Sequence, residues 1–269
     1  MFWAFCYLVL QLFRGTRILN TIFISFLISL SFLSVSVSAQ HQDIWLSSNN
    51  DEVIISAINT ETGNDVPVDL TTGKYLFTAD FSDLGQGTKG TDDPGFNTLD
   101  GTFTPNSILN YRVVGSLSFW DGVQWLGNVP NQEVIRVEDA LGNITTISPD
   151  TITNQVGAID MVSNTGMVHQ HVEFYIDNLN SDEPSPGIYM FELECFVTDA
   201  LGGNTIYSSS DSVRIALNYL IDESGFNTAI SALTDPVAES VPIPSIFIFI
   251  SWFLLTIIGH SSLRRNKLI

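Results

Sequence analysis

The distribution of charge along the chain limits what it can fold into. All 29 acidic residues of the 269-residue sequence lie between residues 40 and 240. Residues 1–39 and 241–269 contain no acid and hold five of the ten basic residues. We therefore expect two apolar, basic ends around a strongly acidic middle, each in different surroundings. The acidic middle repels phosphate, so we do not expect a nucleic-acid partner.

The N-terminal end has the pattern of a secretory signal peptide. A continuous apolar run over residues 18–37 follows two arginines and leads into small residues before Gln40. This pattern predicts a signal peptide over residues 1–39, cleaved by signal peptidase between Ala39 and Gln40. An uncleaved membrane anchor is the alternative, because a further apolar stretch over residues 1–13 precedes the arginines.

The C-terminal end has the pattern of a membrane anchor with a sorting signal. Val241-Pro242-Ile243-Pro244 opens an apolar run that ends at Gly259, and basic residues follow at 264–267. This layout resembles the PEP-CTERM sorting tails of bacteria, which exosortase-type enzymes recognise, although Pro-Glu-Pro is typical where Val-Pro-Ile-Pro stands here. We expect residues 241–269 to hold a transmembrane helix with a cytoplasmic basic end. Residues 40–240 would then be exported, held at the inner membrane before processing and later placed at the cell surface or outside the cell.

The acidic middle, residues 40–240, predicts an all-β domain. Turn sequences such as Thr62-Gly63-Asn64 and Asp121-Gly122 recur at short intervals. This spacing is typical of an antiparallel β-sandwich, either jelly-roll or immunoglobulin-like. Helical periodicity is confined to Asp222–Leu233. The predicted strands are Val53–Ile58, Tyr75–Phe81, Val113–Trp120, Glu133–Val137, Met167–Ile176, Ile188–Val197 and Val213–Leu220.

Cysteine is almost absent from the acidic middle. Cys195 is its one cysteine, since Cys6 lies in the predicted signal peptide. This excludes an intramolecular disulfide in the processed domain and a zinc site built from several thiolates. Cys195 falls among apolar alternating positions, so we expect a buried core residue.

Two histidines mark the candidate site. Within Met167–Asp177 the odd positions include His169, His171 and Glu173, whereas the even positions are mostly apolar. Alternate side chains of a strand point to opposite faces, so these three share the polar face. Imidazoles about 7 Å apart at their β-carbons can reach one ion, and neutral imidazole suits zinc, copper or nickel. A plain polar strand face is the alternative.

A second strand would add carboxylates to this site. In Ile188–Val197 the apolar positions are odd, which leaves Glu194 on the polar face. If the loop Asn178–Gly187 closes a hairpin, matching the apolar faces places Glu194 beside the histidines. Either Glu194 or Glu173 would then bind the ion or orient a histidine. His41, directly after the predicted cleavage point, would be an optional further ligand.

Three motifs together with the sorting tail resemble one family. They are Asp92-Asp93-Pro94-Gly95-Phe96, Trp120-Asp121-Gly122-Val123-Gln124-Trp125 and His169-Gln170-His171. The combination is similar to the Zur-regulated PEP-CTERM proteins, which bacteria make when the zinc-uptake repressor releases its operators. The resemblance covers most of residues 41–267. It implies a secreted or surface-held protein that binds zinc under scarcity, with envelope zinc-uptake components as partners.

Other readings of these motifs lead to different functions. Asp92-Asp93-Pro94-Gly95 could hold calcium, but it lacks the alternation of an EF-hand and predicts a plain turn. Trp120 and Trp125 could stack on sugars, although we expect them to cover the edge of the core. The sequence has no Gly-x-Ser-x-Gly elbow and no phosphate-binding Gly-x-x-x-x-Gly-Lys-Ser/Thr loop, so we do not expect an enzyme. The alternative to zinc binding is a structural or adhesive protein of an extracellular matrix.

Overall fold

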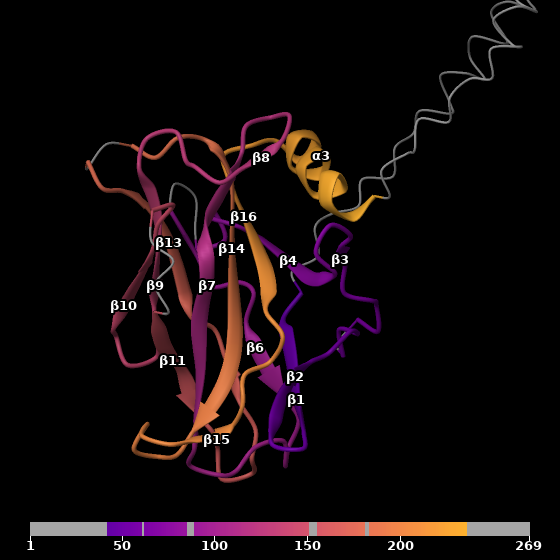
Figure 1. The fold of residues 1–269 in the computed structure, drawn as a ribbon, viewed down its shortest axis with the longest axis vertical. Coiled ribbons are helices and arrows are strands. Elements are labelled where there is room, and N and C mark those ends of the chain that lie inside the picture. Colours follow the sequence, from indigo (N-terminus) through magenta and orange to yellow (C-terminus); the bar gives the residue numbers. More distant parts are fainter. Residues whose placement is uncertain (1–41, 61, 85–88, 151–154, 181–182, 236–269) are drawn as a thin grey trace, which may run out of the picture. The chain divides into compact units, whose positions relative to one another are not determined.

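The computed structural model describes residues 42–60, 62–84, 89–150, 155–180 and 183–235. Strands dominate these ranges, and the expected all-β class is confirmed (Figure 1). The predicted signal peptide and sorting tail lie outside the described residues. Among the helices that the described ranges contain, none is long and apolar enough to cross a membrane.

The strands form three sheets, each named here after one of its strands. The β1 sheet has the order β12 (His169–Gln170), β6 (Phe96–Thr98), β1 (Ile44–Asn49) and β2 (Glu52–Ile55). The β9 sheet has the order β10 (Ile144–Ile147), β9 (Glu133–Glu138), β13 (Glu173–Asn178) and β5 (Gly90–Thr91). The β14 sheet has the order β11 (Val156–Met161), β7 (Ile108–Trp120), β14 (Gly187–Thr198), β16 (Val213–Tyr219), β4 (Lys74–Asp80) and β3 (Val68–Asp69), with β15 (Thr205–Tyr207) beside β14 and β8 (Trp125–Leu126) beside β7.

The expectation of purely antiparallel pairing is wrong for two strand pairs of the described residues. β1 runs parallel to β6, and β16 runs parallel to β4. Neither pair is consecutive in sequence, so both are joined by long connections rather than by hairpins. Parallel neighbours require such a crossover, and turn spacing alone does not reveal it.

The alternation predicted for the two central strands is confirmed. Phe174 and Ile176 of β13 are buried, and Tyr189, Phe191 and Cys195 of β14 belong to the same core cluster. Burial raises the pKa of the Cys195 thiol, as expected for an inert core residue. Residues from all three sheets contribute to this one core.

The predicted hairpin between these two strands is wrong. β13 pairs with β9 and β5, whereas β14 pairs with β7 and β16. Instead, β13 and β14 contact each other through their apolar side chains: the ring centroids of Phe174 and Phe191 lie 5.7 Å apart. Apolar faces can be buried by packing across a core as well as side by side. Their polar faces therefore point away from each other.

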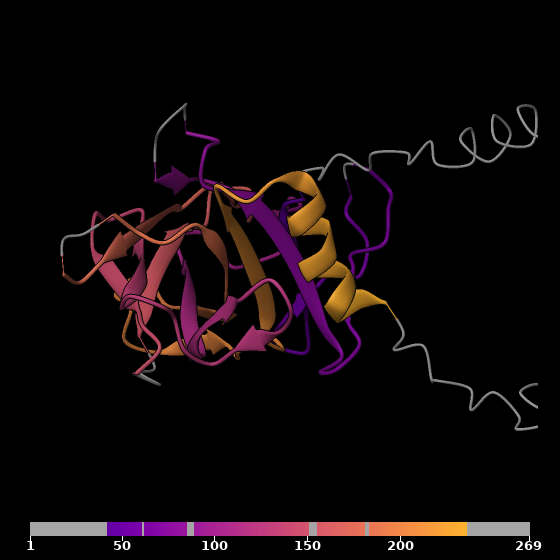
Figure 2. The same cartoon turned by 90° about the horizontal axis from the view of Figure 1, so that it is seen from above.

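The outer face of the β14 sheet is covered in two ways. The helix α3 (Glu223–Thr234) lies against it, and Phe226, Ala229 and Leu233 bury a second apolar cluster there (Figure 2). The helical periodicity predicted for this segment is confirmed, and Asp222 caps its N-terminus by accepting the Gly225 N–H. Beyond the helix, ion pairs cover the face: Lys74 and Arg214 with Glu192, Arg214 with Asp69, and Arg112 with Glu194.

Candidate metal centre

Two chain segments pass from the β9 sheet to the β1 sheet at the same place. One runs from β5 through residues 92–95 to β6, and the other connects β12 to β13 through residues 171–172. The segments pair on both sides of this place, as Thr91 with Phe174 and Phe96 with Gln170. Between those pairs the strand ladder is interrupted. We call the interrupted region, residues 92–95 and 171–172, the corner.

The imidazole of His171 fills the corner. Its Nδ1 lies 2.8 Å from the backbone oxygen of Asp92 and 3.5 Å from Oδ1 of Asp93. A carbonyl oxygen only accepts, so Nδ1 carries a proton, and in the neutral imidazole Nε2 then has the lone pair. On the other side the ring lies against Gly95, where an added Cβ would be 2.5 Å from Nε2. Glycine at position 95 is therefore what lets the ring enter.

Asp43 brings a second carboxylate to the corner from the strand next to β6. It directly precedes β1, and its carboxylate accepts the Gly95 N–H at 3.0 Å and the side-chain amide of Asn97. The Ile44 N–H donates to the Gly95 carbonyl at 2.8 Å, which aligns the start of β1 with the corner. The parallel pairing of β1 with β6 thus explains why a residue near the start of the domain lies beside a histidine far along the chain.

Asp43, Asp93 and His171 together could hold a metal ion. Their candidate ligand atoms all lie within 4.8 Å of one another, and all three residues are half-buried. Two carboxylates with one imidazole suit divalent ions of intermediate softness, zinc among them. The bond from Nδ1 to a backbone carbonyl is the usual support for a histidine that binds a metal through Nε2.

His169 lies next to this cluster but is not one of its three members. Its ring centroid is 5.7 Å from that of His171, and the side chain is exposed. Two imidazoles bound to one tetrahedral zinc have centroids about 5 Å apart, from nitrogen–zinc distances of about 2 Å. The two rings thus lie on the same side of the chain, as strand alternation predicted.

The surroundings of the corner are strongly acidic. Glu173 of β13 lies directly opposite Glu138 of β9, a like-charge pair that destabilises a sheet unless a cation compensates it. The hydroxyl of Tyr175 donates to Glu173. That bond, burial, and the negative charges of Glu173, Glu138 and Asp92 raise the pKa of Tyr175 to about 12. Such a field concentrates cations near the corner.

The other predicted ligands have different positions. Glu173 is exposed and holds the Tyr175 hydroxyl, outside the three-residue cluster. Glu194 lies on the outer face of the β14 sheet, where it is paired with Arg112 and accepts from Ser209. His41 lies outside the described residues. The structure thus brings His169 and His171 together and leaves Glu194 on a different sheet.

Asp43 and Asp93 were not predicted as ligands from the sequence. Asp93 belongs to the Asp92-Asp93-Pro94-Gly95 motif, which we interpreted as a plain turn, and the structure gives it a cis peptide bond before Pro94. Asp43 lies two residues after His41, the residue expected to fold back from the N-terminus. The sequence did contain one signal for Asp93, because the Asp92-Asp93-Pro94-Gly95 motif belongs to the same family resemblance as the histidine motif.

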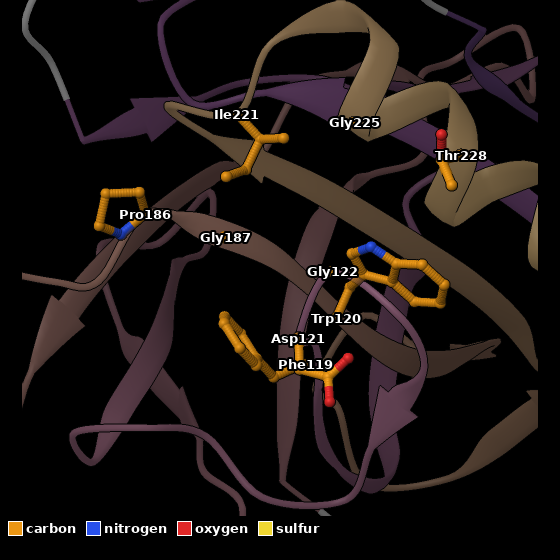
Figure 3. A pocket seen from close by; sticks show the side chains of 9 residues that line it. All are labelled: Phe119, Trp120, Asp121, Gly122, Pro186, Gly187, Ile221, Gly225 and Thr228. Carbon is orange, nitrogen blue, oxygen red and sulfur yellow. The ribbon is translucent and has the colours of Figure 1, made fainter.

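A separate hollow of about 240 Å³ lies between the β7–β8 turn and the start of α3 (Figure 3). It is smaller than the sites that usually hold small-molecule ligands. The expected structural role of the tryptophans is confirmed: Trp120 is buried under α3, and Trp125 Nε1 donates to the Ala229 carbonyl at 3.2 Å. The residues that line the hollow are Phe119, Trp120, Asp121, Gly122, Pro186, Gly187, Ile221, Gly225 and Thr228.

Comparison of the chain with protein-family models finds no match, and comparison with curated proteins finds none.

Proposed function

We propose that this chain is an exported bacterial protein whose β domain binds a divalent metal ion, zinc in the first place, at the corner. One observation carries the proposal: side chains at positions 43, 93 and 171, far apart in sequence, converge on one point. Asp43 and Asp93 would each give a carboxylate oxygen, and His171 would give Nε2. His169 would turn inward as the fourth ligand, which completes the tetrahedral set that zinc prefers.

The wider proposal combines this site with the two ends of the chain. The signal peptide over 1–39 and the PEP-CTERM-like tail over 241–269 would place the domain outside the inner membrane, after signal peptidase and an exosortase-type enzyme have acted. The sheets would form a β-sandwich around the shared core, and the contact between the rings of Phe174 in β13 and Phe191 in β14 supports this. The domain would capture, buffer or deliver zinc under limitation, as the resemblance to Zur-regulated PEP-CTERM proteins implies.

The test is calorimetric titration of the full chain, purified in detergent, with zinc chloride. We expect one site per chain, and at least about tenfold weaker binding in the Asp93→Asn variant and in the His169→Ala/His171→Ala double variant. Asp100→Asn is the control, because it removes an exposed charge outside the cluster and should change Kd less than twofold. Unchanged affinity in both ligand variants would refute the site.

One observation favours the alternative, a structural or adhesive protein without a metal role. The corner has internal hydrogen bonds of its own, from His171 to Asp92 and from Gly95 to Asp43. These bonds satisfy backbone groups where the strand ladder is interrupted, which is a sufficient reason for a histidine there. Absence of zinc binding, together with transcription that is independent of zinc supply, would favour this alternative.

A further inference from the structure

The N-terminal strands have few backbone connections to the rest of the described residues. β1 and β2 form a hairpin, and β1 joins its sheet through three residue pairs with β6. This pairing is parallel, the weaker of the two kinds per residue. Further backbone bonds to the hairpin come from Ser208, with Val53 at 3.1 Å and with Asp51 at 2.7 Å. Opening of the hairpin would break these few backbone bonds and expose the buried side chains of Ile44, Leu46, Val53 and Ile55, so the docked state is favoured even without an ion.

The three cluster residues are divided between this hairpin and the corner. Asp43 moves with β1, whereas Asp93 and His171 belong to the two segments that cross between the sheets. Without a cation, the carboxylates of Asp43 and Asp93 repel one another across less than 4.8 Å. With a cation between them the same two groups attract it from both sides. The ion would therefore turn this charge repulsion into attraction, in addition to the bonds that Asp43 and Ile44 already make with Gly95.

We propose that the bound cation is a clasp that fixes β1 to the corner, so that occupancy of the site controls local opening of the N-terminal hairpin. This inference rests on the proposed function and adds its structural consequence. The ion would bind only when β1 is docked, because one of its ligands leaves with the strand. By mass action, zinc at 100 times its Kd then slows opening-dependent amide exchange about 100-fold.

Hydrogen exchange of the full chain in detergent, followed by mass spectrometry with and without zinc, tests the clasp. We expect peptides covering β1 and β2 to slow by this factor, while peptides of β14 and β16 change less than twofold. Asp43→Asn should abolish the zinc dependence, because asparagine can still accept the Gly95 N–H but lacks the ligand charge. Asp100→Asn, an exposed acid outside the cluster, is the control and should behave as the native chain does.

The outcomes separate the two proposals. Zinc binding in calorimetry with unchanged exchange in β1 and β2 would overturn the clasp and leave the metal site standing. Equal slowing in β14 and β16 would also overturn it, because the ion would then stabilise the whole domain. No zinc binding at all would overturn both proposals.

Discussion

Replacing Gly95 with alanine tests whether the His171 ring is a fixed part of the corner. The new Cβ would lie 2.5 Å from Nε2 and 2.6 Å from Cε1 of His171, so one side must move. The Gly95 backbone is held by bonds to Asp43 and Ile44. The imidazole, 30% exposed, is therefore the group that must turn outward. Its bond to the Asp92 carbonyl is then lost, along with ring contacts, for a total of about 1–2 kcal/mol in the free energy of unfolding.

The assay is urea unfolding of the full chain in detergent, followed by tryptophan fluorescence. In a His171→Ala background the added methyl group meets no ring, so Gly95→Ala should then cost less than about 0.5 kcal/mol. Gly127→Ala is the matched control, since its Cβ would have no neighbour within 4 Å. It should be neutral or stabilise by up to about 1 kcal/mol. An equal cost of Gly95→Ala in both backgrounds would refute the reasoning, because the strain would then lie in the backbone.

Three further predictions concern stability away from the corner. Asp69→Asn should cost about 3 kcal/mol in urea unfolding, because it removes the buried partner of Arg214. Trp125→Phe should cost about 1 kcal/mol in the same assay, through the lost bond to Ala229. Burial alone would raise the pKa of Asp139, but bonds from three backbone N–H groups hold it below 3.8. The Asp139 carboxylate therefore contributes to the free energy of unfolding above the usual aspartate pKa, and this contribution is lost as the pH falls through the lowered pKa. The urea midpoint of the native chain should drop below about pH 4, and the midpoint of the Asp139→Asn variant should drop less over the same pH range.

Burial could be predicted from the sequence because it depends on local alternation. Val168, Val172, Phe174 and Ile176 are all buried as expected, although the chain between them changes sheets. The period of two is a property of extended backbone and does not require one continuous strand. The same alternation predicted that His169 and His171 lie together on the polar side of the chain.

Neighbours could not be predicted, because alternation says which way a side chain points and not which strand lies beside it. Glu194 was assigned to the histidines through a hairpin that the chain does not form. Asp43 was missed because its position depends on a parallel crossover between β1 and β6, which leaves no mark in the spacing of turns. The histidines of the site could thus be predicted from local alternation, whereas its two carboxylates reach the site only through the order of the strands.

The two segments that cross at the corner bind the β1 sheet and the β9 sheet into one mechanical unit. Each crossing segment has residues in both sheets, so the paired strands of one sheet continue directly into the paired strands of the other. Thermal unfolding followed at Trp45 in β1 and at Tyr175 in β13 should accordingly give the same midpoint temperature.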